Sequence, residues 1–171
     1  AQDPMIPLML WYGMAPLTKN FKDSPGLLFE PVLAPNRIPL VREYLARDLA
    51  LQGQKFPAFT SLLVRMASDD DPLLQRDLLR GMQAALRGQR NVPMPMGWKS
   101  VYQVLIASPL PEVRERALAL AVQFGDERAF ALLRQIVPDR ARPGSERESA
   151  LQTLLFQQKS DVVPILFDLL G

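Results

Sequence analysis

Apolar residues recur every three or four positions along residues 111–170, a spacing that predicts consecutive amphipathic helices. The clearest segment is 111–125, where Glu115 and Arg116 lie on the side opposite the apolar stripe. The stripe consists of Val113, Ala117, Leu120, Ala121 and Phe124. Gly125 is expected to end this helix, because glycine commonly follows a last helical turn. One face of the helix therefore requires a neighbour.

The segments that follow repeat this plan. Asp126 opens a helix that extends to Val137, and another helix is expected over 144–158 after a basic loop at 139–145. The residues expected to point inward from 144–158 are Ala150, Leu151, Leu154 and Leu155. A last apolar run begins at Asp161 and includes Val162, Val163, Ile165, Leu166 and Leu169.

The N-terminal part is less regular. Asp3 and Pro4 have the chemistry of a helix start, and residues 5–14 are apolar nearly all round, so this short helix is expected to be covered on both sides. Pro16 is expected to end it. A polar connector over 19–25 and a second short apolar helix over 26–33 follow.

Longer helices are predicted in the middle of the chain. Residues 37–52 lie between an Asn36 cap and a Gly53 stop, with Arg42, Glu43 and Arg47 expected to face water. The apolar stripe of this helix is Ile38, Val41, Leu45, Ala46 and Leu49.

Three further helices are expected over 56–67, 72–86 and 98–108. Residues 69–71 supply the cap of 72–86, and Gly88 closes it before a loop over 88–97 that has no periodicity. The inward residues of 72–86 are Leu78, Leu79, Met82 and Leu86, and those of 98–108 are Val101, Val104 and Leu105.

Helix pairs therefore repeat along the chain at uneven intervals. The segment 111–118, with Asp126 opening the next helix, resembles a HEAT repeat, whose second helix typically carries Val-Arg followed by small residues and leucine. We expect an all-α fold, a right-handed HEAT-like α-α solenoid of about four helix pairs. It would form a single domain over 1–171, with irregular N-terminal helices over 1–35 and repeat pairs over 36–171.

A second resemblance lies in Asp3-Pro4-Met5-Ile6-Pro7-Leu8-Met9-Leu10-Trp11-Tyr12. This stretch resembles the segment that opens the helical-repeat region of large planctomycete-type secreted haem-binding proteins. In that family a sorbosone-dehydrogenase-like β-propeller precedes the repeats, and a cytochrome c module with a CxxCH motif follows. The resemblance implies a middle segment of a larger extracytoplasmic or periplasmic protein, which would act as a spacer or docking module. A cytoplasmic location stays open.

The amino-acid composition limits the reactions that this chain could catalyse and the ligands that it could bind. The 171 residues are 48% hydrophobic and 8% aromatic, so the core must consist mainly of Leu, Ala, Val and Met. The absence of Cys and His excludes thiol nucleophiles, disulfides, CxxCH haem attachment and imidazole acid/base catalysis by this chain. The net charge of +2 gives little support to nucleic-acid binding. We therefore assign no catalytic residue, cofactor or metal, and the family's haem and catalytic residues have no counterpart here.

Arg76, Arg80 and Arg87 are predicted to share one helix face with Gln83. They could bind phosphate or an acidic partner, as in HEAT-like DNA glycosylases, or form a solvated face paired with carboxylates such as Asp77. A glycosylase would also need aromatic residues and a carboxylate near the flipped base. The candidates are Trp98, Tyr102 and one of Asp69, Asp70 and Asp71, but helix capping accounts for these aspartates more simply.

Trp11 and Tyr12 could anchor a partner domain or belong to the core. Met94 and Met96 could be soft metal ligands, although a hydrophobic plug is the simpler interpretation. The leading hypothesis is a non-catalytic scaffold that binds protein, either neighbouring domains of a parent chain or another protein. The alternative is a nucleic-acid-binding, repair-type protein that uses the arginine face. The apolar run 5–12 is too short to span a membrane.

Overall fold

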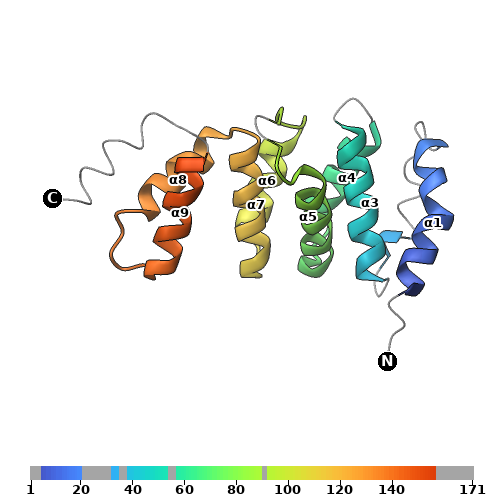
Figure 1. Ribbon diagram of the computed structural model, residues 1–171, viewed down its shortest axis with the longest axis horizontal. Coiled ribbons are helices and arrows are strands. Elements are labelled where there is room, and N and C mark those ends of the chain that lie inside the picture. Colours follow the sequence, from blue (N-terminus) through green and yellow to red (C-terminus); the bar gives the residue numbers. More distant parts are fainter. Residues whose placement is uncertain (1–4, 21–31, 35–37, 54–56, 90–91, 157–171) are drawn as a thin grey trace. The chain divides into compact units, whose positions relative to one another are not determined.

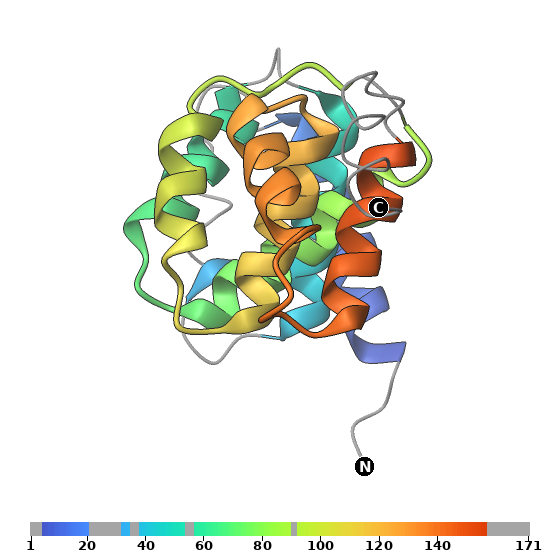
Figure 2. The same ribbon diagram turned by 90° about the vertical axis from the view of Figure 1, so that its left-hand side faces the viewer.

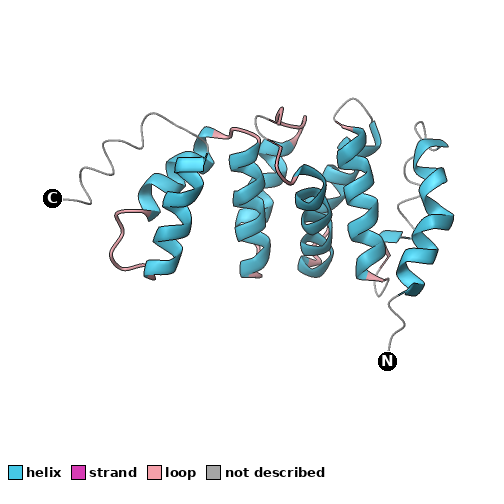
Figure 3. Ribbon diagram, in the orientation of Figure 1, coloured by secondary structure: helices cyan, strands magenta, loops and turns pink. Residues whose placement is uncertain are grey.

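The computed structural model describes residues 5–20, 32–34, 38–53, 57–89 and 92–156. These residues form eight labelled helices and no strand, which confirms the predicted all-α class (Figure 3). The helices are α1 (Met5–Asn20), α3 (Pro39–Gln52), α4 (Pro57–Ser68), α5 (Pro72–Leu86), α6 (Trp98–Ile106), α7 (Pro111–Gln123), α8 (Glu127–Ile136) and α9 (Gly144–Phe156). None of the helices described has the length and apolar character needed to cross a membrane.

The chain divides into two compact units. The larger unit comprises 1–89 and 94–120, and the smaller comprises 90–93 and 121–171. The single-domain organisation over 1–171 stays a prediction.

Alternate helices pack together in the larger unit. Helix α3 packs most extensively on α5 and also contacts α1, so α1, α3 and α5 lie side by side in chain order (Figure 1). Helix α4 packs on α6, and the two lie together at the left of Figure 2. Smaller contacts of α4 with α3 and α5 join the two sets of helices.

The α3–α5 contact is close because α5 has a glycine where the two backbones meet. A Cβ atom on Gly81 would clash with the carbonyl oxygen of Glu43 and lie 2.8 Å from the Cβ of Ala46. Leucines and a methionine of the same two helices are fully buried, as the sequence pattern predicts. They are Leu45 and Leu49 from α3, and Leu78, Leu79 and Met82 from α5.

The start of α5, the end of α7 and the start of α8 follow the predicted chemistry. The Asp71 carboxylate accepts a hydrogen bond of 2.9 Å from the backbone N–H of Leu73, and Pro72 occupies the first turn of α5. Asp126 caps α8 in the same way through the N–H of Arg128. Gly125 ends α7 with a φ of 72°, a left-handed conformation that favours glycine.

The smaller unit is built on the packing of α8 against α9. The buried residues are Ala129, Phe130, Leu133 and Ile136 of α8, and Ala150 and Leu154 of α9. The Arg147 side chain also donates a hydrogen bond of 2.8 Å to the carbonyl oxygen of Val137. This bond ties α9 to the end of α8.

The predicted stop at Pro16 is wrong, because α1 continues through it to Asn20. Pro16 is exposed, and the turn beyond it is held by Thr18. The Thr18 hydroxyl oxygen lies 2.7 Å from both the carbonyl oxygen of Ala15 and the carboxylate of Asp48 in α3. The contact with Asp48 ties the turn after Pro16 to α3.

Two residues expected to point inward are exposed. Val104 lies outside the buried face of α6, because Trp98 and Tyr102 shift that face away from it. Leu155 lies at the edge of the narrow buried stripe of α9, while Leu154 is fully buried. Helix α3 begins at Pro39 after Ile38 rather than at residue 37. The predictions for Asp3, Pro4, Asn36, most of 26–33 and the run from 161 to 169 lie outside the described residues.

We expect Gly81→Ala to destabilise the larger unit by about 1–3 kcal/mol or more, because the added methyl group meets backbone atoms of α3 that cannot move independently. Urea unfolding monitored by circular dichroism measures this loss. The control is Gly13→Ala, since Gly13 lies within α1 and has open space around it. Alanine there should leave stability unchanged or raise it by about 0.5–1 kcal/mol. Equal effects of the two substitutions would contradict the close contact.

Candidate functional site

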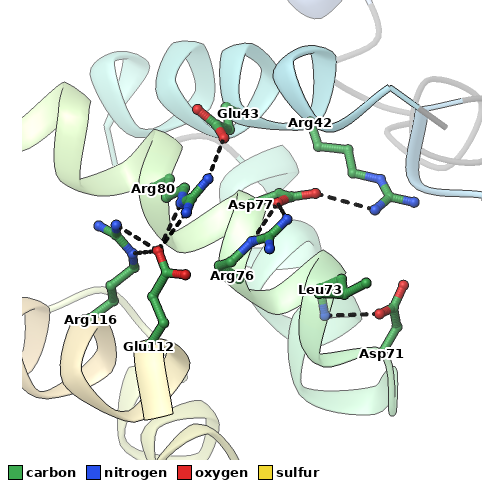
Figure 4. Close-up of polar contacts among 9 residues, drawn as sticks. All are labelled: Arg42, Glu43, Asp71, Leu73, Arg76, Asp77, Arg80, Glu112 and Arg116. Atoms are coloured by element: carbon green, nitrogen blue, oxygen red, sulfur yellow. Dashed lines mark hydrogen bonds and ion pairs between the residues drawn. The ribbon is translucent and has the colours of Figure 1, made fainter. Parts of the chain in front are cut away.

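The first polar cluster is buried between α3 and α5. Asp77 is 0% exposed and accepts hydrogen bonds on one oxygen from Arg76, at 2.7 and 3.0 Å. Its other oxygen is 3.3 Å from Arg42, whose side chain is 4% exposed. Arg42 also donates to the carbonyl oxygen of Ala34 at 2.9 Å. One carboxylate thus joins a buried arginine of α3 to an arginine of its own helix (Figure 4).

A second, half-exposed cluster continues from α3 through α5 to α7. Arg80 donates two hydrogen bonds, of 2.7 and 2.9 Å, to one oxygen of Glu112, and also lies 3.6 Å from Glu43. Arg116 approaches the same Glu112 oxygen at 2.8 and 2.9 Å and donates to the Gln83 side chain. Figure 4 shows Arg80 between the two glutamates.

The pKa values of the two glutamates in this cluster shift in opposite directions. Hydrogen bonds from Arg80 and then Arg116 hold the pKa of Glu112 below its ordinary value of 4.5. Burial raises the pKa of Glu43 above 4.5, and this effect exceeds the opposing attraction of Arg80. Glu112 is therefore the stronger partner of Arg80.

The three arginines of the predicted basic face have different surroundings. Arg76 and Arg80 are half-buried and bound to carboxylates, whereas Arg87 is exposed at the C-terminal end of α5. The carboxylates neutralise much of the charge that this face would offer to a phosphate. The predicted pairing of Arg76 with Asp77 is present.

Sequence reasoning missed Arg42, which was expected to face water. On a helical wheel Arg42 falls among Ile38, Leu45 and Leu49, so its position within the apolar stripe was the available signal. A charged residue at such a position calls for a partner from a neighbouring helix. That partner, Asp77, lies one turn before Gly81.

The residues considered for a glycosylase site take part in helix capping or in the core. Asp71 caps α5, and Asp69 accepts the N–H of Asp71 at 3.1 Å, as the capping interpretation predicts. Trp98 and Tyr102 are buried and stack with ring centroids 6.4 Å apart. These aromatic rings are therefore not available on a surface to stack on a flipped base.

The plug interpretation of Met96 is wrong, because its side chain is 78% exposed. Met94 is half-buried. Met96 borders a shallow apolar groove of about 400 Å³ beside α4, to which Leu63, Val64 and Val101 also contribute. The portion of the chain that is described has no cluster of three carboxylates that could hold a metal ion.

Trp11 and Tyr12, although adjacent in sequence, have different surroundings on α1. Trp11 packs on Tyr44 of α3 with ring centroids 6.0 Å apart, in agreement with the core interpretation. Tyr12 is 68% exposed, so that interpretation is wrong for it. The expectation that residues 5–14 are covered on both sides is also wrong.

Tyr12 belongs to an apolar surface that we call the α1 outer face. Its members are Met5, Ile6, Met9, Leu10 and Tyr12. They are exposed because α1 contacts α3 through one side only, and the side that faces away carries the same kind of residue. The chain has no charged residue between Met5 and Thr18.

No family model, curated protein or solved structure matches this chain.

We expect Asp77→Ala to destabilise the protein by about 3–5 kcal/mol, because Arg42 would stay buried without its carboxylate. Urea unfolding measures the loss, and Asp70→Ala on the exposed turn before α5 is the control, with an expected effect within about 0.5 kcal/mol. Adding Arg42→Met to Asp77→Ala should recover part of the stability, since it removes the unpaired charge. No recovery would show that the loss has another origin.

We expect Glu112→Gln to reduce stability near neutral pH and to have a smaller effect as the pH falls below 4.5. A carboxyl group with a lowered pKa in the folded state stabilises the fold above its unfolded pKa, and this contribution is lost as the pH falls through the folded pKa. Urea midpoints across this pH range measure the effect. Glu115→Gln, at an exposed position of the same helix, is the control. A Glu112→Gln effect independent of pH would contradict the assignment.

Proposed function

We propose that this chain is a non-catalytic helical-repeat scaffold that binds protein through the α1 outer face. The observation that carries the proposal is the exposure of five large apolar side chains on one helix that has no charged residue from Met5 to Thr18. Contiguous apolar surface of this kind is typical of interaction sites in soluble proteins. Tyrosine and methionine, both present here, are enriched in protein interfaces.

The repeat architecture belongs to the same proposal. The packing of α3 on α5 and of α4 on α6 supports a HEAT-like α-α solenoid of about four helix pairs. In such an array every helix pair is covered by its neighbours, except at the ends. Among the described helices, the extensive contact of α1 is with α3, which is the situation of an end helix that a further domain can cover.

The partner we propose is a domain of a larger extracytoplasmic, haem-linked, dehydrogenase-like protein. Support comes from the resemblance of residues 3–12 to the segment that opens the repeats in planctomycete-type secreted haem-binding proteins. The scaffold would hold the oxidoreductase and haem domains together without reacting itself. Nucleic-acid binding has less support, because Arg76 and Arg80 are already bound to carboxylates.

We expect a photo-crosslinking amino acid at position 12, introduced into the protein in its source cells, to form a specific adduct with a haem-linked, dehydrogenase-like domain outside the cytoplasm. Fractionation, haem staining and mass spectrometry identify the adduct. The control position is Leu73 of α5, which is also exposed and apolar but lies on another helix. Equal crosslinking from both positions would contradict docking at the α1 outer face. A haem-negative adduct confined to the cytoplasm would contradict the proposed partner.

Tyr12→Glu should weaken this association by about 30-fold or more if Tyr12 is a central contact, since such residues contribute at least about 2 kcal/mol. Co-purification, without crosslinking, of the partner that the crosslinking experiment identifies measures the change. Leu73→Glu is the matched control.

A further inference from the structure

Sulfur chemistry in this chain rests on methionine alone. The sequence contains seven methionines and no cysteine. Without a thiol, the thioether sulfurs are the side-chain groups most readily oxidised by a peroxide. The product, methionine sulfoxide, is polar, so oxidation changes the surface on which the methionine lies.

Burial differs widely among the methionines, and Met14 and Met94 are half-buried. Met66 and Met82 are 0% exposed within the core of the larger unit. Met9 is 67% exposed and Met5 54%, and both belong to the α1 outer face. Met96 is exposed beside α4. Accessible methionines should therefore be oxidised before the core is affected.

Met5 and Met9 differ from Met96 in being paired. They are four residues apart on α1, so their side chains lie one turn apart on the same side of the helix. No charged side chain of α1 lies between Met5 and Thr18. The few side chains of the α1 outer face therefore determine whether this surface is apolar. Two sulfoxides would place two strong hydrogen-bond acceptors on this surface.

We infer that Met5 and Met9 form a modification site through which a peroxide converts the α1 outer face from apolar to polar. The thioether sulfur attacks one peroxide oxygen, the O–O bond breaks and an S–O bond forms. With hydrogen peroxide the other oxygen leaves as water after it gains a proton. The sulfur loses two electrons and the peroxide gains them. Reduction of the sulfoxide by a thiol-dependent reductase restores the apolar face.

The consequence for docking rests on the proposed function. A partner that buries the α1 outer face would have to desolvate the sulfoxide oxygens, which costs free energy unless the partner supplies donors. Oxidation therefore weakens docking and leaves the core of the array intact.

The site itself is tested without any partner. The full chain is treated with increasing hydrogen peroxide, and peptide mass spectrometry follows the addition of single oxygen atoms at each methionine. Met5 and Met9 should react at least about tenfold faster than Met66 and Met82, which corresponds to an opening free energy of about 1.4 kcal/mol or more for the buried pair. Equal rates for the two groups would overturn the inference.

The change of the surface is tested by retention on a phenyl-substituted resin. Peroxide should make the wild-type protein elute earlier, while its circular dichroism spectrum stays unchanged. The Met5→Leu/Met9→Leu variant, compared with itself before and after peroxide, should lose much less retention than the wild-type protein, because, of the exposed methionines, only Met96 can still be oxidised. Met96→Leu is the matched control and should still lose retention. A loss in the double variant equal to that of the wild-type protein, or protection by Met96→Leu, would overturn the inference. If both tests succeed and crosslinking at position 12 fails, the oxidation site stands and the proposed function is wrong.

Discussion

The larger unit depends on the absence of a side chain at Gly81. Without a Cβ atom there, the backbones of α3 and α5 meet directly, with Ala46 on the facing helix. Close approach of two helices requires small residues on both sides of the contact. Two polar links between the helices depend on this distance: Arg42 reaches Asp77, and Glu43 reaches Arg80. If the helices were farther apart, the buried charge of Arg42 would lose its carboxylate.

The buried pair selects one register of α3 on α5. Apolar contacts between leucine and alanine side chains have no direction, so they distinguish one register from another less sharply than a buried charge does. A buried arginine tolerates only the arrangement that places a carboxylate beside it. Asp77 meets this requirement from a position where Arg76 occupies its second oxygen. The glycine contact and the ion pair therefore favour the same arrangement for different physical reasons.

Much of the fold was predictable from local patterns. The caps at Asp71 and Asp126 and the stop at Gly125 depend on neighbouring residues, so the sequence alone identified them. Contacts between helices were harder to predict from the sequence. The periodicity of α3 did place Arg42 in the apolar stripe, but no local rule connects Arg42 with Asp77, which lies 35 positions away.

The candidate sites show the same division between local and distant information. The exposed side of α1 could not be predicted, because an all-round apolar segment predicts burial unless one knows that, among the described helices, its extensive contact is with α3. The ion pairs of Arg80 with Glu112 and Glu43 likewise come from other helices. In contrast, the partner of Arg76 is its neighbour in sequence, and the pattern did suggest it.

Helix α1 is held to the larger unit from one side. Its described links to α3 are the ring contact of Trp11 with Tyr44 and the hydrogen-bonded group of Thr18, Asp48 and Gln52. A helix attached in this way can detach by a local transition that leaves the α3–α5 core folded. A ligand that binds only the attached form lowers the population of the detached form by thermodynamic linkage. Amide protons of α1 would then exchange with solvent more slowly in the complex, although the ligand touches only the opposite side of the helix.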